Sequence, residues 1–259
     1  MRKGVAGVSM VMMMPVAPSR RGTEDVRRSA TLALLAGCGL LAGCGLLAAG
    51  CSSAGHDQVY AQRLNAYANA TQFAPLQAEA TNAAAGRLAI RLPKEFRDQI
   101  DDRDKGTPPF LRDFPGFVAA YQVQRPVGTT QYPVSLVVGT VPAAERRRED
   151  VKQVILEQVR GDESFRKAAW GKPRQVEDVT GQPRTWDVLT LEGEQPFELI
   201  DTGSPVEKRR PGVTEIWVSA DPKQKACVVL AWRVPDEVAA AVSLATLAPL
   251  TARTVSIAD

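Results

Sequence analysis

Three apolar runs decide the fold of this chain: RTWDVLTL (Arg184–Leu191), VTEIWVS (Val213–Ser219) and KACVVLAWRV (Lys225–Val234). They are rich in β-branched and aromatic residues, which are enriched in strands. Shorter runs of the same kind lie at 175–179 and 197–200. Turns between the runs are expected at Gly181, Gly193, Gly203 and Pro222. This spacing of strands and turns predicts an antiparallel meander.

The residues on either side of the meander predict further strands and two helices. Strands are expected over 88–92, 117–124 and 134–141, the last as a buried central strand because it is almost continuously apolar. A helix is expected from Pro142 to about residue 160, and another over 237–247. Helices segregated from a largely antiparallel sheet indicate the α+β class, with the helices packed on the sheet as a layered sandwich.

A helical tether is predicted in front of this domain. Asp57–Ala74 has the pattern of a helix, with Tyr60, Leu64 and Tyr67 at helical spacing. There are two alternatives for this helix. It docks on the domain through these side chains, or it is a tether that does not pack on the domain. The expected organisation is a leader over 1–50, a spacer and tether over 51–86, and an α+β domain over 87–259.

The leader contains the uncharged stretch TLALLAGCGLLAGCGLLAAGCSS (Thr31–Ser53), which follows Arg27 and Arg28. A positive region, an apolar region and small residues before a cut are the parts of a secretory signal. Small residues precede a cysteine three times in this stretch, at Cys38, Cys44 and Cys51.

These three sites resemble the box of bacterial lipoproteins, in which a Leu and two small residues precede a cysteine. The resemblance implies cleavage before that cysteine, a diacylglyceryl group on its sulfur and acyl chains such as palmitate. Cys44 has Leu41 at the preferred position and ranks first. Cys51 carries the Ser52-Ser53 tail and ranks second, and Cys38 ranks last.

Two features of the leader leave alternatives open. The run Ala30–Gly50 is long enough to be an uncleaved transmembrane helix, because about 18 apolar residues already suffice. The acidic pair Glu24-Asp25 does not suit a signal, which suggests translation from Val26. In either case the domain is expected in the cell envelope, anchored to a membrane and facing the periplasm or the exterior.

The charge balance argues against nucleic acid as a partner. Residues 1–51 hold six of the 32 Lys and Arg residues and two of the 29 acidic residues. The remainder therefore carries 26 basic and 27 acidic residues, a net charge of −1. A nucleic-acid binder would show a basic surplus. The expected partners are the membrane, through the lipid, and an envelope protein.

The sequence offers little equipment for catalysis. His56 lies in the spacer, and Cys227 sits in an apolar strand, where cysteine usually packs as a small hydrophobic residue. No metal and no cofactor is expected, because zinc needs three or four His, Cys or acidic ligands. A pair of carboxylates could still hydrolyse a substrate. Candidates for it lie on the expected strands and turns: Asp187, Glu192, Glu194, Glu198 and Glu215.

Aromatic residues supply the candidate binding surface. The loop PPFLRDFPGF contains Phe110, Phe114 and Phe117. An exposed apolar loop of this kind marks a partner site, whereas a loop folded over the sheet edge would be structural. The tryptophans in the meander are expected in the core, unless Trp186, Trp217 and Trp232 share an exposed face as a platform.

The order of elements resembles the PsbP-like fold, over residues 87–257. The features that carry the resemblance are LAIRLPKEF (88–96), the helix after 134–141, the meander with Gly181 and Trp186, and the last helix running into 254–257. The resemblance implies a non-catalytic role in binding or assembly. The leading hypothesis is therefore a lipid-anchored binding module, and the alternative is a carboxylate-dependent envelope hydrolase.

Overall fold

The computed structural model describes residues 53–83, 87–96, 98–100, 114, 116–220 and 225–257 of the 259-residue chain. Both sheets belong to the unit Ala54–Asp259. Among the helices of the described part, none combines the length and the apolar character needed to cross a bilayer.

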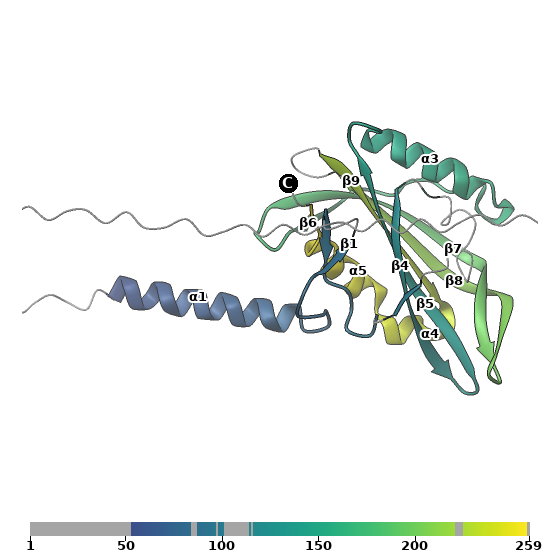
Figure 1. Ribbon diagram of the computed structural model, residues 1–259, viewed down its shortest axis with the longest axis horizontal. Coiled ribbons are helices and arrows are strands. Elements are labelled where there is room, and N and C mark those ends of the chain that lie inside the picture. The colour runs from purple at the N-terminus through teal and green to yellow at the C-terminus, as the bar shows by residue number, and fades with distance from the viewer. Residues whose placement is uncertain are drawn as a thin grey trace, which may run out of the picture. The chain divides into compact units, whose positions relative to one another are not determined.

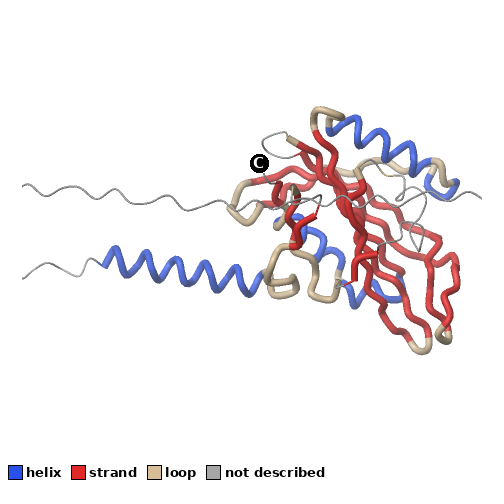
Figure 2. Tube along the Cα trace, viewed as in Figure 1, coloured by secondary structure: helices blue, strands red, loops and turns tan. Residues whose placement is uncertain are grey.

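A seven-stranded antiparallel sheet forms the centre of the domain (Figures 1 and 2). Its strands in spatial order are β3 (Asp98–Ile100), β4 (Phe117–Val127), β5 (Thr130–Pro142), β9 (Ala226–Pro235), β8 (Ser204–Ala220), β7 (Pro183–Asp201) and β6 (Arg174–Glu177). Strands β6 to β9 neighbour one another in chain order, which confirms the predicted antiparallel sheet.

A second, three-stranded sheet joins the two ends of the domain. It consists of β1 (Thr81–Ala83), β2 (Leu88–Ile90) and β10 (Ser256–Ile257), in the order β1-β2-β10. Next to it, the backbone N–H of Arg91 donates to the hydroxyl of Thr254 at 3.0 Å. Sequence-distant segments are thus tied together at the edge of the domain.

Helices cover both faces of the large sheet, as predicted for a layered α+β fold (Figure 1). On one face lies α3 (Arg148–Arg160), and against the other lie α4 (Asp236–Val242) and α5 (Leu244–Arg253). The stripe of α3 that packs on the sheet is Val151, Ile155 and Val159. Such a stripe results from apolar residues three or four positions apart.

Strand β9 shows how the sheet separates two cores, because all ten of its residues are buried. Its even-numbered residues from Val228 to Val234 belong to the larger core, with α4 and α5. Its odd-numbered residues from Cys227 to Ala231 belong to the smaller core, with α3. Side chains alternate between the two faces of a strand. A strand that buries apolar side chains on both faces therefore lies in the centre of its sheet.

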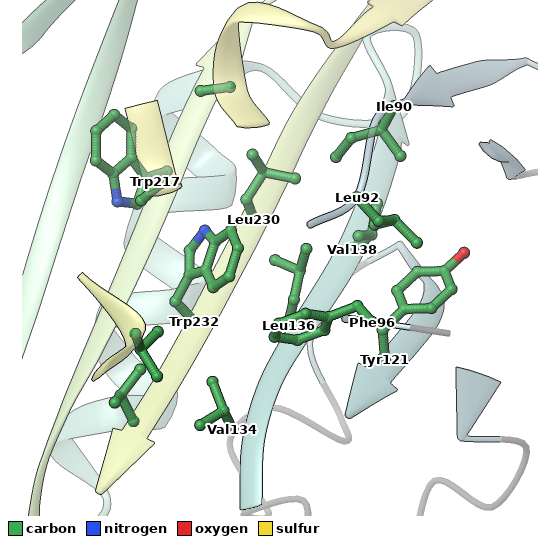
Figure 3. Packing of buried hydrophobic residues seen from close by; sticks show 14 of the residues in the cluster. Ile90, Leu92, Phe96, Tyr121, Val134, Leu136, Val138, Trp217, Leu230 and Trp232 are labelled. Carbon is green, nitrogen blue, oxygen red and sulfur yellow. The ribbon is translucent and has the colours of Figure 1, made fainter. Parts of the chain in front are cut away.

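The larger core is built around aromatic rings (Figure 3). Trp232 has no exposed surface, and its ring centroid lies 5.8 Å from that of Phe96 at 77°. Trp186 and Trp217 are likewise fully buried, with ring centroids 6.2 Å apart. Edge-to-face pairs of this kind add stabilisation beyond the area that they bury.

The turn predicted at Gly193 is wrong. β7 continues through Gly193, which has a φ of +128° and lies opposite Gly212 in β8. The chain reverses instead at Thr202 and Gly203. The tip of this long hairpin then pairs with β5, where Asp201 lies opposite Thr130. A glycine inside a strand can accommodate a sharp bend. Because glycine is also typical of turns, the sequence alone predicted a turn at this position.

A buried arginine lies where this hairpin closes on the sheet, in a region we call the closed corner (Gln195, Pro196, Phe197, Thr214 and Arg233). The guanidinium of Arg233 donates to the Pro196 carbonyl at 2.5 Å and lies 4.6 Å from the centroid of the Phe197 ring. Desolvation lowers its pKa to about 9, so that the side chain is still charged at pH 7. Thr214 donates to Gln195 at 2.6 Å.

The helices start and end differently from the predicted boundaries. Pro142 belongs to β5, where it lies opposite Ala226, and α3 begins only at Arg148. The Asp150 carboxylate accepts the backbone N–H of Arg147 at 3.2 Å, which fixes that start. The single helix expected after Asp236 is two helices, because Ser243 takes a left-handed conformation between them.

The helix α1 (Ser53–Gln72) is exposed along its described side chains. Tyr60, Leu64 and Tyr67 are 60%, 51% and 74% exposed, so they do not dock on the domain. The core begins directly after the helix, with Phe73 and Leu76 buried. The segment 81–83 forms β1 and belongs to the domain, although the sequence predicts it as part of the tether.

Candidate functional site

A network of charges connects the first turn of α3 to β7. The Asp187 side chain is 4% exposed, and its Oδ2 lies 3.3 Å from both Arg148 Nε and Lys152 Nζ. Glu149 accepts hydrogen bonds from the same two cations, at 3.3 Å and 2.9 Å. The bond from Lys152 is the main cause that lowers the pKa of Glu149. The network therefore holds the start of α3 firmly on the sheet.

A cavity of about 850 Å³ lies beside this network. We call it the α3 pocket, and its lining residues are Ala143, Arg146, Arg147, Arg148, Glu149, Asp150, Ala220, Ala226 and Cys227. The alanines are small, and they leave open the space that larger side chains would fill. The charged residues all come from the short connection before α3 and from its first turn.

Not every cation at the α3 pocket has a carboxylate partner among the described residues. Glu149 is engaged by Arg148 and Lys152, and Asp150 accepts the N–H of Arg147. In the part of the chain that the structure describes, no carboxylate lies within ion-pair distance of the guanidinium groups of Arg146 and Arg147. Both side chains are exposed. The pocket therefore presents a surplus of positive charge.

Cys227 lies at the pocket but is not a reactive group. It is 2% exposed, and desolvation raises the pKa of its thiol. The thiolate is the nucleophilic form of cysteine, so a raised pKa keeps Cys227 neutral and inert at pH 7. Within the described residues, no group of three or more His, Cys, Asp or Glu side chains could hold a metal ion.

The carboxylates that could have formed a hydrolytic pair lie apart. Asp187 is on the α3 face of the sheet, as its contacts with α3 show. Glu215 is on the opposite face, where it accepts the Trp217 indole N–H at 2.9 Å and lies 3.7 Å from Arg174. Glu192 and Glu194 are exposed and Glu198 is half-buried. The two buried acids thus cannot act on one substrate, although carboxylate hydrolysis needs both beside the scissile bond.

The predicted aromatic loop is only partly described. Phe114 is 4% exposed and packs in the smaller core with Phe117, which is half-buried. A Cβ at Gly139 would lie 2.4 Å from the Phe114 ring, so the glycine makes room for this packing. Phe110 lies outside the described residues. Truncating Phe114 would therefore disturb the core, and it is not a clean test of binding.

The other predicted sites are the lipid-attachment cysteines and the tryptophan platform. The candidate lipid-attachment residues Cys44 and Cys51 lie outside the described residues. Trp186, Trp217 and Trp232 have no exposed surface, so they do not form an exposed platform. The α3 pocket was not predicted from the sequence, although the three successive arginines 146–148 at the start of a helix were the visible signal.

A smaller cavity of about 430 Å³ lies at the junction of α4 and α5. Its lining is mostly apolar or uncharged, and it includes Pro75, Pro93, Val242 and Leu247. Its charged lining residues are Lys94, Glu95 and Arg125, and Arg125 pairs with Glu95. It therefore has one cation, Lys94, outside this pair, whereas the α3 pocket has two, Arg146 and Arg147.

Comparisons with known proteins yield distant structural likenesses. No family model matches the chain, and no curated sequence matches it. It is similar to the Ran-binding protein Mog1p of Saccharomyces cerevisiae, with 11% identity and a TM-score of 0.41 over 71% of this chain and 97% of that one. It is also similar to the PsbP protein CyanoP of Synechocystis, with 10% identity and a TM-score of 0.36 over 71% and 93%. At such low similarity these likenesses have no bearing on function.

Proposed function

We propose that this protein is exported to the bacterial cell envelope and is anchored there by an acylated cysteine, Cys44 or Cys51. Its α+β domain then acts as a non-catalytic binding module for a ligand or an envelope protein. The observation that carries the proposal is α1, a helix of 20 residues that is exposed over its described length. It follows the candidate cysteines directly and ends where the domain core begins.

The dimensions of α1 suit a spacer. At 1.5 Å per residue, a 20-residue helix is about 30 Å long. Such a helix keeps a domain clear of lipid headgroups while leaving it attached. Its lack of packing on the domain is what a tether requires, whereas a helix of the domain itself would bury an apolar stripe.

A binding role also fits the arrangement of charges better than hydrolysis does. Each buried acid is neutralised by its own partners, Asp187 by Arg148 and Lys152, and Glu215 by Arg174. The groups left without an ion pair at the α3 pocket are cations. Cations at a cavity bind acidic groups. The two carboxylates beside them, Glu149 and Asp150, are held by Lys152 and by the backbone N–H of Arg147.

The anchor is tested by replacing both candidate cysteines with serine in the full chain. Cys44→Ser with Cys51→Ser is expected to move most of the protein, tenfold or more, from the membrane fraction to the soluble fraction. The reason is that stable attachment by acyl chains requires the modified cysteine. Immunoblots of the fractions from a bacterial host measure the ratio.

The matched control is Cys227→Ser, which makes the same change at a buried site of the domain and should leave the protein in the membrane. Each single variant at 44 or 51 shows which cysteine carries the lipid. If the double variant stays in the membrane fraction, Cys38→Ser is added to it. A triple variant that still stays there contradicts the lipid anchor and supports the uncleaved transmembrane helix.

A further inference from the structure

We infer that the α3 pocket binds a small anionic molecule through carboxylate or phosphate groups. The inference deepens the proposed function, since it names the ligand class of the binding module. It depends on the geometry of the domain alone, so it can fail while the lipid anchor holds, or hold while the anchor fails.

The size of the cavity fits a small molecule. Ligand pockets commonly have volumes of about 300–1,000 Å³, and the α3 pocket has about 850 Å³. Ala143, Ala220 and Ala226 contribute only methyl groups to its lining. The neutral thiol of Cys227 adds no negative charge that would repel an anion.

The charge of the pocket selects an anion. Its lining holds three arginines and two acidic residues. Both acids are occupied, Glu149 by the side chains of Arg148 and Lys152, and Asp150 by the backbone of Arg147. The guanidinium groups of Arg146 and Arg147 have no ion pair among the described residues, and they are the free groups.

Two guanidinium groups that line one pocket are suited to oxygen anions. A guanidinium presents a planar fork of donors that matches the two oxygens of a carboxylate or phosphate. Charge-assisted bonds of this kind are about twice as strong as neutral ones. Arg146 and Arg147 could therefore hold two anionic groups of one molecule, which favours a ligand with more than one carboxylate or with linked phosphates.

The wall of the pocket is formed in advance of binding. Arg148 and Lys152 are held at 3.3 Å from the buried carboxylate of Asp187, and the stripe of α3 that includes Val151 is buried in the smaller core. The start of α3 is thus fixed on the sheet before a ligand arrives. A preformed site loses less entropy on binding, which raises its affinity.

The test uses the purified full chain in detergent and two probes, citrate for carboxylates and pyrophosphate for phosphates. Isothermal titration calorimetry measures the dissociation constant of each probe. The double variant Arg146→Ala with Arg147→Ala is expected to weaken the preferred probe tenfold or more. The arm that binds better identifies which of the two chemistries the natural ligand carries.

The matched control is Arg166→Ala with Lys167→Ala, which removes the same charge at two exposed residues that do not line the pocket. It should bind like the unchanged protein. A second readout is arginine modification by phenylglyoxal, mapped by mass spectrometry, which bound probe should slow at Arg146 and Arg147 and not at Arg166. Equal affinity in both double variants, or failure of the unchanged protein to bind either probe, would overturn the inference.

Discussion

Replacing Trp232 by alanine is expected to lower the free energy of unfolding by about 4 kcal/mol, near the top of the range for large-to-small changes in a core. Trp232 has no exposed surface and lies in β9, the strand between β5 and β8. The change removes the edge-to-face contact with Phe96 and leaves a cavity in the larger core. Urea unfolding followed by circular dichroism measures the loss.

Val127→Ala is the control, since Val127 is 45% exposed at the β4–β5 turn. Its effect should stay within about 0.5 kcal/mol, as for most surface changes. Trp232→Phe should fall between the two variants, because it keeps an aromatic ring in the same place. A Trp232→Ala protein as stable as the Val127→Ala protein would mean that this core is not packed as described.

Arg233→Ala is expected to destabilise the protein by about 3 kcal/mol, the top of the range for leaving a buried hydrogen-bond acceptor without its donor. The change deprives the Pro196 carbonyl of its donor and removes the side chain that stacks on Phe197. Hydrogen exchange should show the loss of protection mainly in the β7–β8 hairpin, beyond Gly193 and Gly212. The end of this hairpin pairs with β5, through Ile200 and Asp201.

Arg233→Met separates packing from charge at the same position. Methionine fills much of the space without a buried charge, and replacing buried ionic groups with apolar ones is often neutral or stabilising. We therefore expect Arg233→Met to recover more than half of the stability that alanine loses. If methionine destabilises as much as alanine, the hydrogen bond to Pro196 outweighs the packing at the closed corner.

The fold class could be predicted because its signals are local. Alternation in β2 and continuous apolar runs in β5 and β9 follow from the faces that each strand buries. The stripe Val151, Ile155 and Val159 of α3 is a local signal of the same kind. These patterns need no knowledge of which strand pairs with which.

The predictions that were wrong concern features that depend on contacts between residues distant in the sequence. Gly193 looks like a turn residue, but its pairing with Gly212 keeps β7 continuous through it. The left-handed conformation of Ser243, which divides the last helix, has no marker such as glycine. The segment 81–83 is a strand because β2 pairs with it, and not because of its own composition.

The candidate site likewise depends on contacts between residues that are distant in the sequence. Three successive arginines at the start of a helix are typical of a solvated helix face. Nothing local indicates that Ala220 and Cys227 lie beside them. The pocket exists because β8 and β9 bring these residues to the start of α3. Phe114 differs from the expectation in the opposite direction. It was a candidate for an exposed binding surface, but it packs beneath the surface where Gly139 leaves space for its ring.

The anchored binding module is tested most directly by mass spectrometry of the N-terminal peptide of the protein purified from bacterial membranes. The proposal predicts a peptide that begins at Cys44 or Cys51 and carries the mass of a diacylglyceryl group, with or without a further acyl chain. An unmodified peptide that spans both Cys44 and Cys51 would contradict it.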